Sequence, residues 1–122
     1  MKRSLYNAWL KALETAPNGA GVLKNDQGMC CLGVLCSIIP EVTESIYKEA
    51  EGSVTQFAYK GTNSIHYLPD NLAGELSMST SGSAYFGTGV SLTILNDSSN
   101  TFAPVIQALR DHPENYFEIE ED

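Results

Sequence analysis

The stretch that decides the fold is MCCLGVLCSII, residues 29–39. It is the most apolar run of the chain and is long for a buried strand. We therefore interpret it as a buried helix that ends before Pro40. Gly33 inside this helix costs about 1 kcal/mol relative to alanine, which favours a close helix contact at that point.

The segment before this run predicts an amphipathic helix. Ser4 can cap the helix, which must end by Ala16 because Pro17 follows. Residues 22–24 then predict a short extended piece. The apolar face of the helix consists of Leu5, Ala8, Trp9, Ala12 and Leu13. Core packing and a subunit contact explain this face, with its tryptophan, equally well.

The segment after the apolar run is typical of β-structure. Residues 53–60, SVTQFAYK, alternate, with Thr55, Phe57 and Tyr59 on one side of the expected strand. We expect a turn at residues 61–63 and a second strand, residues 64–68, that pairs back as a hairpin. A short helix should follow over residues 71–76, after Pro69 and Asp70 open it.

The C-terminal third begins with a loop-like segment. Residues 77–91 are rich in Ser, Thr and Gly, which indicates a loop that could serve as a lid or a binding loop. Residues 96–100 are a dense turn signal before a helix over residues 102–110, and residues 116–119 predict a final edge strand. The whole chain, residues 1–122, thus predicts one α+β domain, with two to three helices packed on a small antiparallel sheet.

The charge of the protein is concentrated at its C-terminus. The formal net charge is −8, and five acidic residues lie in residues 113–122, which leaves −3 for the rest. This acidity argues against long nucleic acids and anionic membranes as partners. The chain shows no membrane-spanning stretch and no signal-peptide pattern. Its three cysteines, of which two are adjacent, suit reduced thiols in a cytoplasmic protein.

Common catalytic and metal-binding motifs are missing from the sequence. It has no phosphate-binding glycine loop of the P-loop or dinucleotide type, no HExxH and no CxxC. The two histidines, His66 and His112, do not follow a metal-ligand pattern. We therefore expect no catalytic residue, metal or cofactor. A Cys–His nucleophile pair stays open, because its partners can lie far apart in sequence.

A binding site for a neutral polar ligand with a planar base fits the composition of residues 77–101 better. Phe86 or Tyr85 could stack on the base, and Asn96 could hydrogen-bond to its edge. Backbone N–H groups near Gly87 and Gly89 could hold phosphate oxygens.

Each of these residues also has a purely structural interpretation. Phe86 could fill the core while the Ser/Gly run forms a surface loop. Asn96 and Asp97 could form an Asx turn that leads into a helix, which is a common use of such residues.

Several motifs together resemble a family of small phage proteins. They are WLKAL (9–13), MCCLGVLC (29–36), YLP (67–69) and LND (95–97), followed by Phe102. With them the chain resembles the Thoeris anti-defense 1 family of phage sponge proteins. The resemblance implies a protein that sequesters glycocyclic ADP-ribose, the signal of a bacterial TIR-domain enzyme, without degrading it, so that the NADase effector is not activated. It also implies action in the cytoplasm of the infected bacterial host.

The resemblance carries site residues with it. It implies Phe86 as the stacking residue and Asn96 as the hydrogen-bonding residue, and proximity adds Tyr85, Thr88 and Asp97. The family also implies a homo-oligomer, dimer or hexamer, and a separate site for the cyclic trinucleotides of CBASS signalling. The candidates for that second site are Lys60 and Arg110.

Because the chain has few cations, we expect it to hold its ligand by stacking, hydroxyl groups and backbone amides, with modest salt dependence. Two alternatives remain. One is an enzyme that hydrolyses the same signal, with His66 or Cys36 as catalyst. The other is an acidic protein inhibitor that caps a host effector through residues 113–122.

Overall fold

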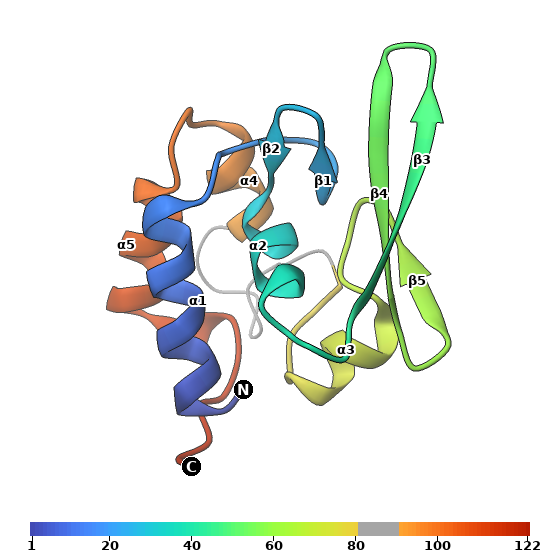
Figure 1. Cartoon of the computed structure of the whole chain (residues 1–122). Helices are drawn as coiled ribbons and strands as arrows, with labels where there is room; N and C mark the ends of the chain where they lie inside the picture. The colour runs from blue at the N-terminus through green and yellow to red at the C-terminus, as the bar shows by residue number, and fades with distance from the viewer. Residues whose placement is uncertain (81–90) are drawn as a thin grey trace.

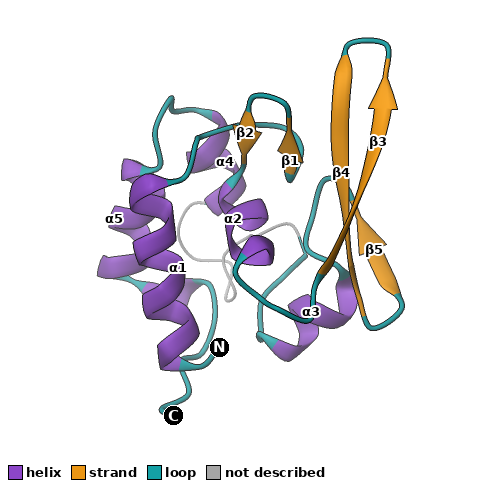
Figure 2. Ribbon diagram, viewed as in Figure 1, coloured by secondary structure: helices purple, strands orange, loops and turns teal. Residues whose placement is uncertain are grey.

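The computed structural model describes residues 1–80 and 91–122 (Figure 1). The predicted α+β class is confirmed: helices gather on one side of the molecule and an antiparallel sheet lies beside them (Figure 2). The described residues hold five α-helices, where two to three were expected, and three of these are six or seven residues long. In chain order the elements are α1 (Arg3–Thr15), β1 (Lys24–Asn25), β2 (Gly28–Met29), α2 (Cys31–Ser37), β3 (Thr43–Glu49), β4 (Gly52–Tyr59), β5 (Thr62–Ser64), α3 (Asp70–Glu75), α4 (Leu92–Asp97), α5 (Ala103–Asp111) and the 3₁₀ turn η1 (Pro113–Asn115).

The helical part of the core is built around Trp9. Helix α1 contacts α2 and α5, and α4 contacts the same two helices. Trp9 is fully buried, its Nε1 donates to the Cys31 carbonyl at 3.0 Å, and its ring lies 6.2 Å from that of Phe117. Core packing therefore accounts for this residue, and it does not provide a subunit contact.

Helix α2 is shorter than the apolar run predicts. Met29 belongs to β2, and the helix ends at Ser37, before Pro40. The expected close approach at Gly33 is confirmed, although its partner is not a helix. A Cβ on Gly33 would lie 1.9 Å from the backbone oxygen of Leu23, so no side chain fits there. The first helix also differs slightly, because it begins at Arg3 and Ser4 does not cap it.

Strand β4 is the centre of the sheet. Strand β3 pairs along one edge of β4, while β1 and β5 pair with it on the other edge, and β2 extends the sheet from β1. The predicted alternation is confirmed, with Thr55, Phe57 and Tyr59 buried. One face of β4 therefore contributes to the core.

The hairpin between β4 and β5 is tighter than expected. Tyr59 pairs with Thr62, so the turn consists of Lys60 and Gly61, both with positive φ (47° and 89°). Such a two-residue turn with two positive φ angles is typical of hairpins of type I′. The expected turn at residues 61–63 and strand at residues 64–68 are therefore wrong: β5 ends at Ser64, and His66 lies on an exposed loop.

Three further segments differ from expectation. Residues 43–49 form β3, which the sequence did not predict, and residues 92–97 form α4 where an approach to a turn was expected. Residues 116–119 form no strand; Tyr116 and Phe117 are instead buried after the short turn η1. Nothing among the described helices is both long and apolar enough to cross a membrane.

Candidate ligand-binding site

Asn96 is the most deeply buried of the predicted site residues that the structure describes. It lies in the last turn of α4 and has no exposed surface. Its Oδ1 accepts the backbone N–H of Cys31 at 2.8 Å, at the first turn of α2. Its Nδ2 donates to the Gly19 carbonyl at 2.9 Å and to Asp97 Oδ1 at 3.2 Å.

These bonds define what Asn96 can do. Both amide hydrogens are used, so no N–H of the side chain is free to bind a ligand. The oxygen caps the N-terminus of α2 from a distant part of the chain, in place of the local cap that Cys30 does not provide. The expected Asx turn and helix entry is thus replaced by a cap on another helix. Asn96 holds the site together and does not reach out of it.

Asp97, next to this amide, lines a small pocket with both polar and apolar walls. The pocket has a volume of about 130 Å³ and is lined by Gly21, Cys30, His66, Tyr67, Thr93, Asn96 and Asp97. Asp97 is exposed and its Oδ1 also accepts the Gly21 N–H at 3.4 Å. The second carboxylate oxygen is in none of the hydrogen bonds that the described residues make. The pocket therefore offers an anionic acceptor at its rim.

Two aromatic side chains also line the pocket. The ring centroids of His66 and Tyr67 are 6.4 Å apart with a 57° tilt, and Tyr67 is 50% exposed. His66 Nδ1 lies 3.0 Å from the Gly21 carbonyl, which only accepts, so Nδ1 carries the proton of this bond. A neutral His66 then presents Nε2 as an acceptor. The wall combines a stacking surface with hydrogen-bonding groups.

The charge of this pocket limits the chemical groups that it could accept. Among the described residues no lysine or arginine lines it, and Asp97 would repel a phosphate group. The acceptors at Asp97 and His66 instead suit the amino group of a base or the hydroxyls of a ribose. Its volume is below the 300–1,000 Å³ of pockets that hold a whole drug-sized ligand, and it fits one base or one sugar.

The thiols near the site are poorly suited to nucleophilic chemistry. Cys30, Cys31 and Cys36 are all buried and unpaired by disulfides. Burial raises the pKa of all three thiols, that of Cys36 to about 12. Because the thiolate is the nucleophile, these values argue against Cys36 as a catalyst. Across residues 1–80 and 91–122, no group of three His, Cys, Asp or Glu side chains is placed to hold a metal ion.

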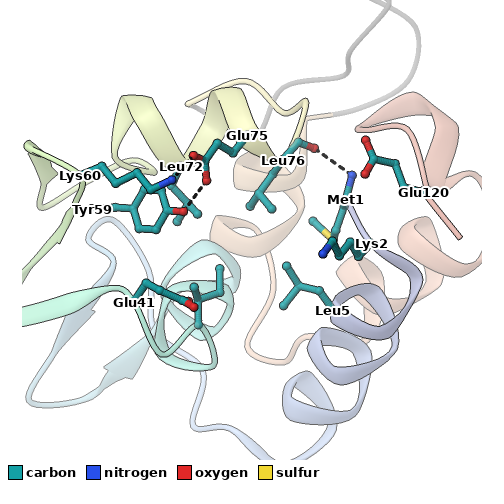
Figure 3. Close-up of a pocket in the computed structure, with 11 residues that line it drawn as sticks. Met1, Lys2, Leu5, Glu41, Tyr59, Lys60, Leu72, Glu75, Leu76 and Glu120 are labelled. Atoms are coloured by element: carbon teal, nitrogen blue, oxygen red, sulfur yellow. Dashed lines mark hydrogen bonds and ion pairs between the residues drawn. The ribbon is translucent and has the colours of Figure 1, made fainter. Parts of the chain in front are cut away.

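A larger pocket, of about 380 Å³, lies between the N-terminus, α3 and the β4–β5 turn (Figure 3). Its walls are apolar, with Leu5 and Leu72 among them, and its rim carries charges of both signs. Lys60 points across it, but its Nζ is paired with Glu75 at 2.5 Å, and Tyr59 donates to the same carboxylate. The Lys60 cation is thus neutralised by its own chain.

The two candidates for a trinucleotide site are not brought together. Lys60 lies in the β4–β5 turn, whereas Arg110 lies on α5 and pairs with Glu14 at 2.9 Å. The pocket at Lys60 does not include Arg110 among its described lining residues.

Some residues that line the candidate pocket were predicted as site residues, and others were not. Tyr85, Phe86 and Thr88, with the glycines beside them, lie outside the described residues. Asp97 and Asn96 both line the candidate pocket, and their predicted role in ligand binding stays a prediction. Tyr67 was noted within a motif, but neither it nor His66 was assigned to this site; an aromatic pair after a strand is too common a signal to single out.

No protein-family model, curated protein or solved structure that was compared with this chain matches it.

Proposed function

We propose that this protein binds and sequesters a cyclic nucleotide immune signal of the glycocyclic ADP-ribose class, and that it releases the ligand intact. The base of the ligand enters the pocket formed by His66, Tyr67 and Asp97. The phosphates point away from Asp97. Sequestration alone keeps the signal from its effector, so no chemical step is needed.

The observation that carries this proposal is the pairing of a half-exposed aromatic ring with hydrogen-bond acceptors. Tyr67 can stack on a base, and Asp97 and His66 can accept from the amino and hydroxyl groups at its edge. The described lining residues include no lysine or arginine, so the binding depends on stacking and hydrogen bonds. We therefore expect its affinity to change little with salt.

The two alternatives receive less support. The buried thiols do not suit hydrolysis, although the exposed side chains of His66 and Asp97 are candidate bases in the described part of the pocket. The acidic tail, residues 113–122, binds its own N-terminus: Glu121 pairs with Arg3 at 2.8 Å, and Asp122 accepts from Ser4. Those carboxylates are not presented as a free mimic of nucleic acid.

The test is a depletion assay with glycocyclic ADP-ribose. The protein is mixed with the ligand and removed by filtration, and the filtrate is assayed for activation of the effector. Sequestration predicts an inactive filtrate, and recovery of unchanged ligand when the protein is heated. Full activity in the filtrate contradicts the proposal, and a cleaved product identifies a hydrolase instead.

Matched tyrosine variants test the position of the site. Tyr67→Ala should weaken binding by about tenfold or more, because a stacked base contributes about 1–3 kcal/mol. Tyr47→Ala is the control, since Tyr47 on β3 is exposed to the same degree (49% against 50%) and does not line the pocket. Equal binding by both variants places the ligand elsewhere. Phe86→Ala tests the residue implied by the resemblance in the same assay.

A further inference from the structure

Strand β3 forms an open edge of the sheet. Within the described residues β3 is the last strand in the sheet order, and its only strand neighbour is β4. All seven of its residues are exposed, among them Ile46, which is 70% exposed. Figure 1 shows the β3–β4 hairpin extending beyond the helices, so the outer edge of β3 is accessible to another strand.

The hairpin register determines which backbone groups face this edge. Glu49 pairs with Gly52 across a two-residue connection, and a pair in that position must be hydrogen-bonded to each other. Hydrogen-bonded and non-hydrogen-bonded pairs alternate along an antiparallel ladder. The residues that direct their N–H and C=O groups toward β4 are therefore Glu49, Tyr47, Ser45 and Thr43. Those of Glu44, Ile46 and Lys48 point outward. The open edge therefore offers three residues with N–H and C=O groups.

These three residues are complementary to themselves. In an antiparallel pairing of two β3 strands centred on Ile46, Glu44 of each copy lies opposite Lys48 of the other. Ile46 then lies opposite its own copy. A register shifted by two residues pairs fewer residues and places Glu44 or Lys48 opposite an isoleucine. Only the register centred on Ile46 pairs all seven residues and both charges.

We propose that a second copy of this chain pairs with the outer edge of β3, in a two-fold dimer centred on Ile46. Lys48 is in none of the ion pairs made within residues 1–80 and 91–122, so its ammonium group is available to the other copy. Glu44 lies 3.3 Å from Lys24 of its own chain and would lie between two cations in the dimer. The pairing continues the sheet across both molecules and covers the exposed isoleucines. It is independent of the nucleotide pocket.

Charge reversal tests this surface. The mass of the full chain is measured by sedimentation equilibrium from micromolar to millimolar concentration, with near-ultraviolet circular dichroism to check folding. Wild type should change from one copy to two. Lys48→Glu places Glu opposite Glu twice and should raise the dissociation constant by about tenfold or more. The double variant Glu44→Lys/Lys48→Glu restores two opposite pairs and should restore the dimer.

A backbone variant distinguishes edge pairing from simple charge effects. Ile46→Pro removes an N–H that points away from β4, and proline is tolerated at such edge positions, so the variant should fold and stay monomeric. A wild type that is monomeric throughout overturns the proposal. So does a dimer whose dissociation constant is unchanged by Lys48→Glu, whether or not Ile46→Pro folds. Either result would indicate that the charges on β3 protect this edge from pairing.

Discussion

A single buried amide, that of Asn96, joins three parts of the chain that are far apart in sequence. It connects α4 to the first turn of α2 and to the loop at Gly19. The same amide also donates to the carboxylate of Asp97, which in turn accepts the N–H of Gly21 in this loop. The shape of the pocket therefore depends on a residue that offers no donor of its own to a ligand.

Replacing Asn96 by alanine should be strongly destabilising. The change leaves the Cys31 N–H and the Gly19 carbonyl without their partners, and unpaired buried groups cost about 1–3 kcal/mol each. We expect the free energy of unfolding to fall by about 2–4 kcal/mol in urea denaturation. Asn100→Ala, at an exposed position, is the control. A similar, small change in both variants would contradict the role given to Asn96.

At the level of residues, the sequence predicted two lining residues of the candidate pocket but not the contacts that hold them there. The LND motif directed attention to Asn96 and Asp97, and both are at the pocket. A capping bond between residues 31 and 96 depends on how two helices pack, which local patterns do not contain. His66 and Tyr67 were missed as site residues for the same reason, since a loop from another part of the chain brings them there.

At the level of elements, burial decides which segments were predictable. The alternating strand β4 and the amphipathic helices α1 and α5 bury one face each, and their patterns were recognised. Strand β3 buries no residue, so its sequence TESIYKE carries no apolar alternation. The tight turn was predicted to begin one residue too late, at Gly61 instead of Lys60, because Lys is an uncommon residue at positive φ.

Two helical glycines provide a matched test of the packing at α2. A Cβ on Gly33 would overlap the Leu23 backbone, whereas a Cβ on Gly74 in α3 meets no atom of the described residues within 4 Å. Gly33→Ala should therefore lower the free energy of unfolding by about 2–3 kcal/mol or more. Gly74→Ala should leave it unchanged or raise it by up to about 1 kcal/mol, because alanine favours helix. Urea denaturation of both variants checks this, and equal effects would contradict the close approach at Gly33.

At the level of the whole molecule, the two ends of the chain hold each other. The Met1 amine donates to the Glu118 carbonyl at 2.6 Å, and Arg3 N–H donates to the Glu120 carbonyl at 2.8 Å. Asp122 accepts the Ser4 N–H at 3.1 Å, which satisfies an N–H in the first turn of α1 that no local side chain caps. The acidic end, which by composition could be a solvated tail, is thus part of the fold.

Removing residues 118–122 should therefore lower the melting temperature, and the loss should depend on pH. Hydrogen bonds from Arg3 and Ser4 lower the pKa of Glu121 and Asp122, respectively, from the ordinary values of 4.5 and 3.8. A carboxylate with a lowered folded-state pKa stabilises the protein above its unfolded-state pKa, and this contribution is lost as pH falls through the folded value. The difference in melting temperature between wild type and the truncated chain should be largest near neutral pH and should narrow below about pH 4.

Removal of residues 113–122 is the contrasting variant, since it also removes the buried rings of Tyr116 and Phe117 and should prevent stable folding. Thermal scans from neutral pH to pH 3 measure both. A difference that stays constant with pH would show that the two carboxylates do not hold the N-terminus, and unchanged melting on removal of residues 118–122 would show that the backbone bonds do not either.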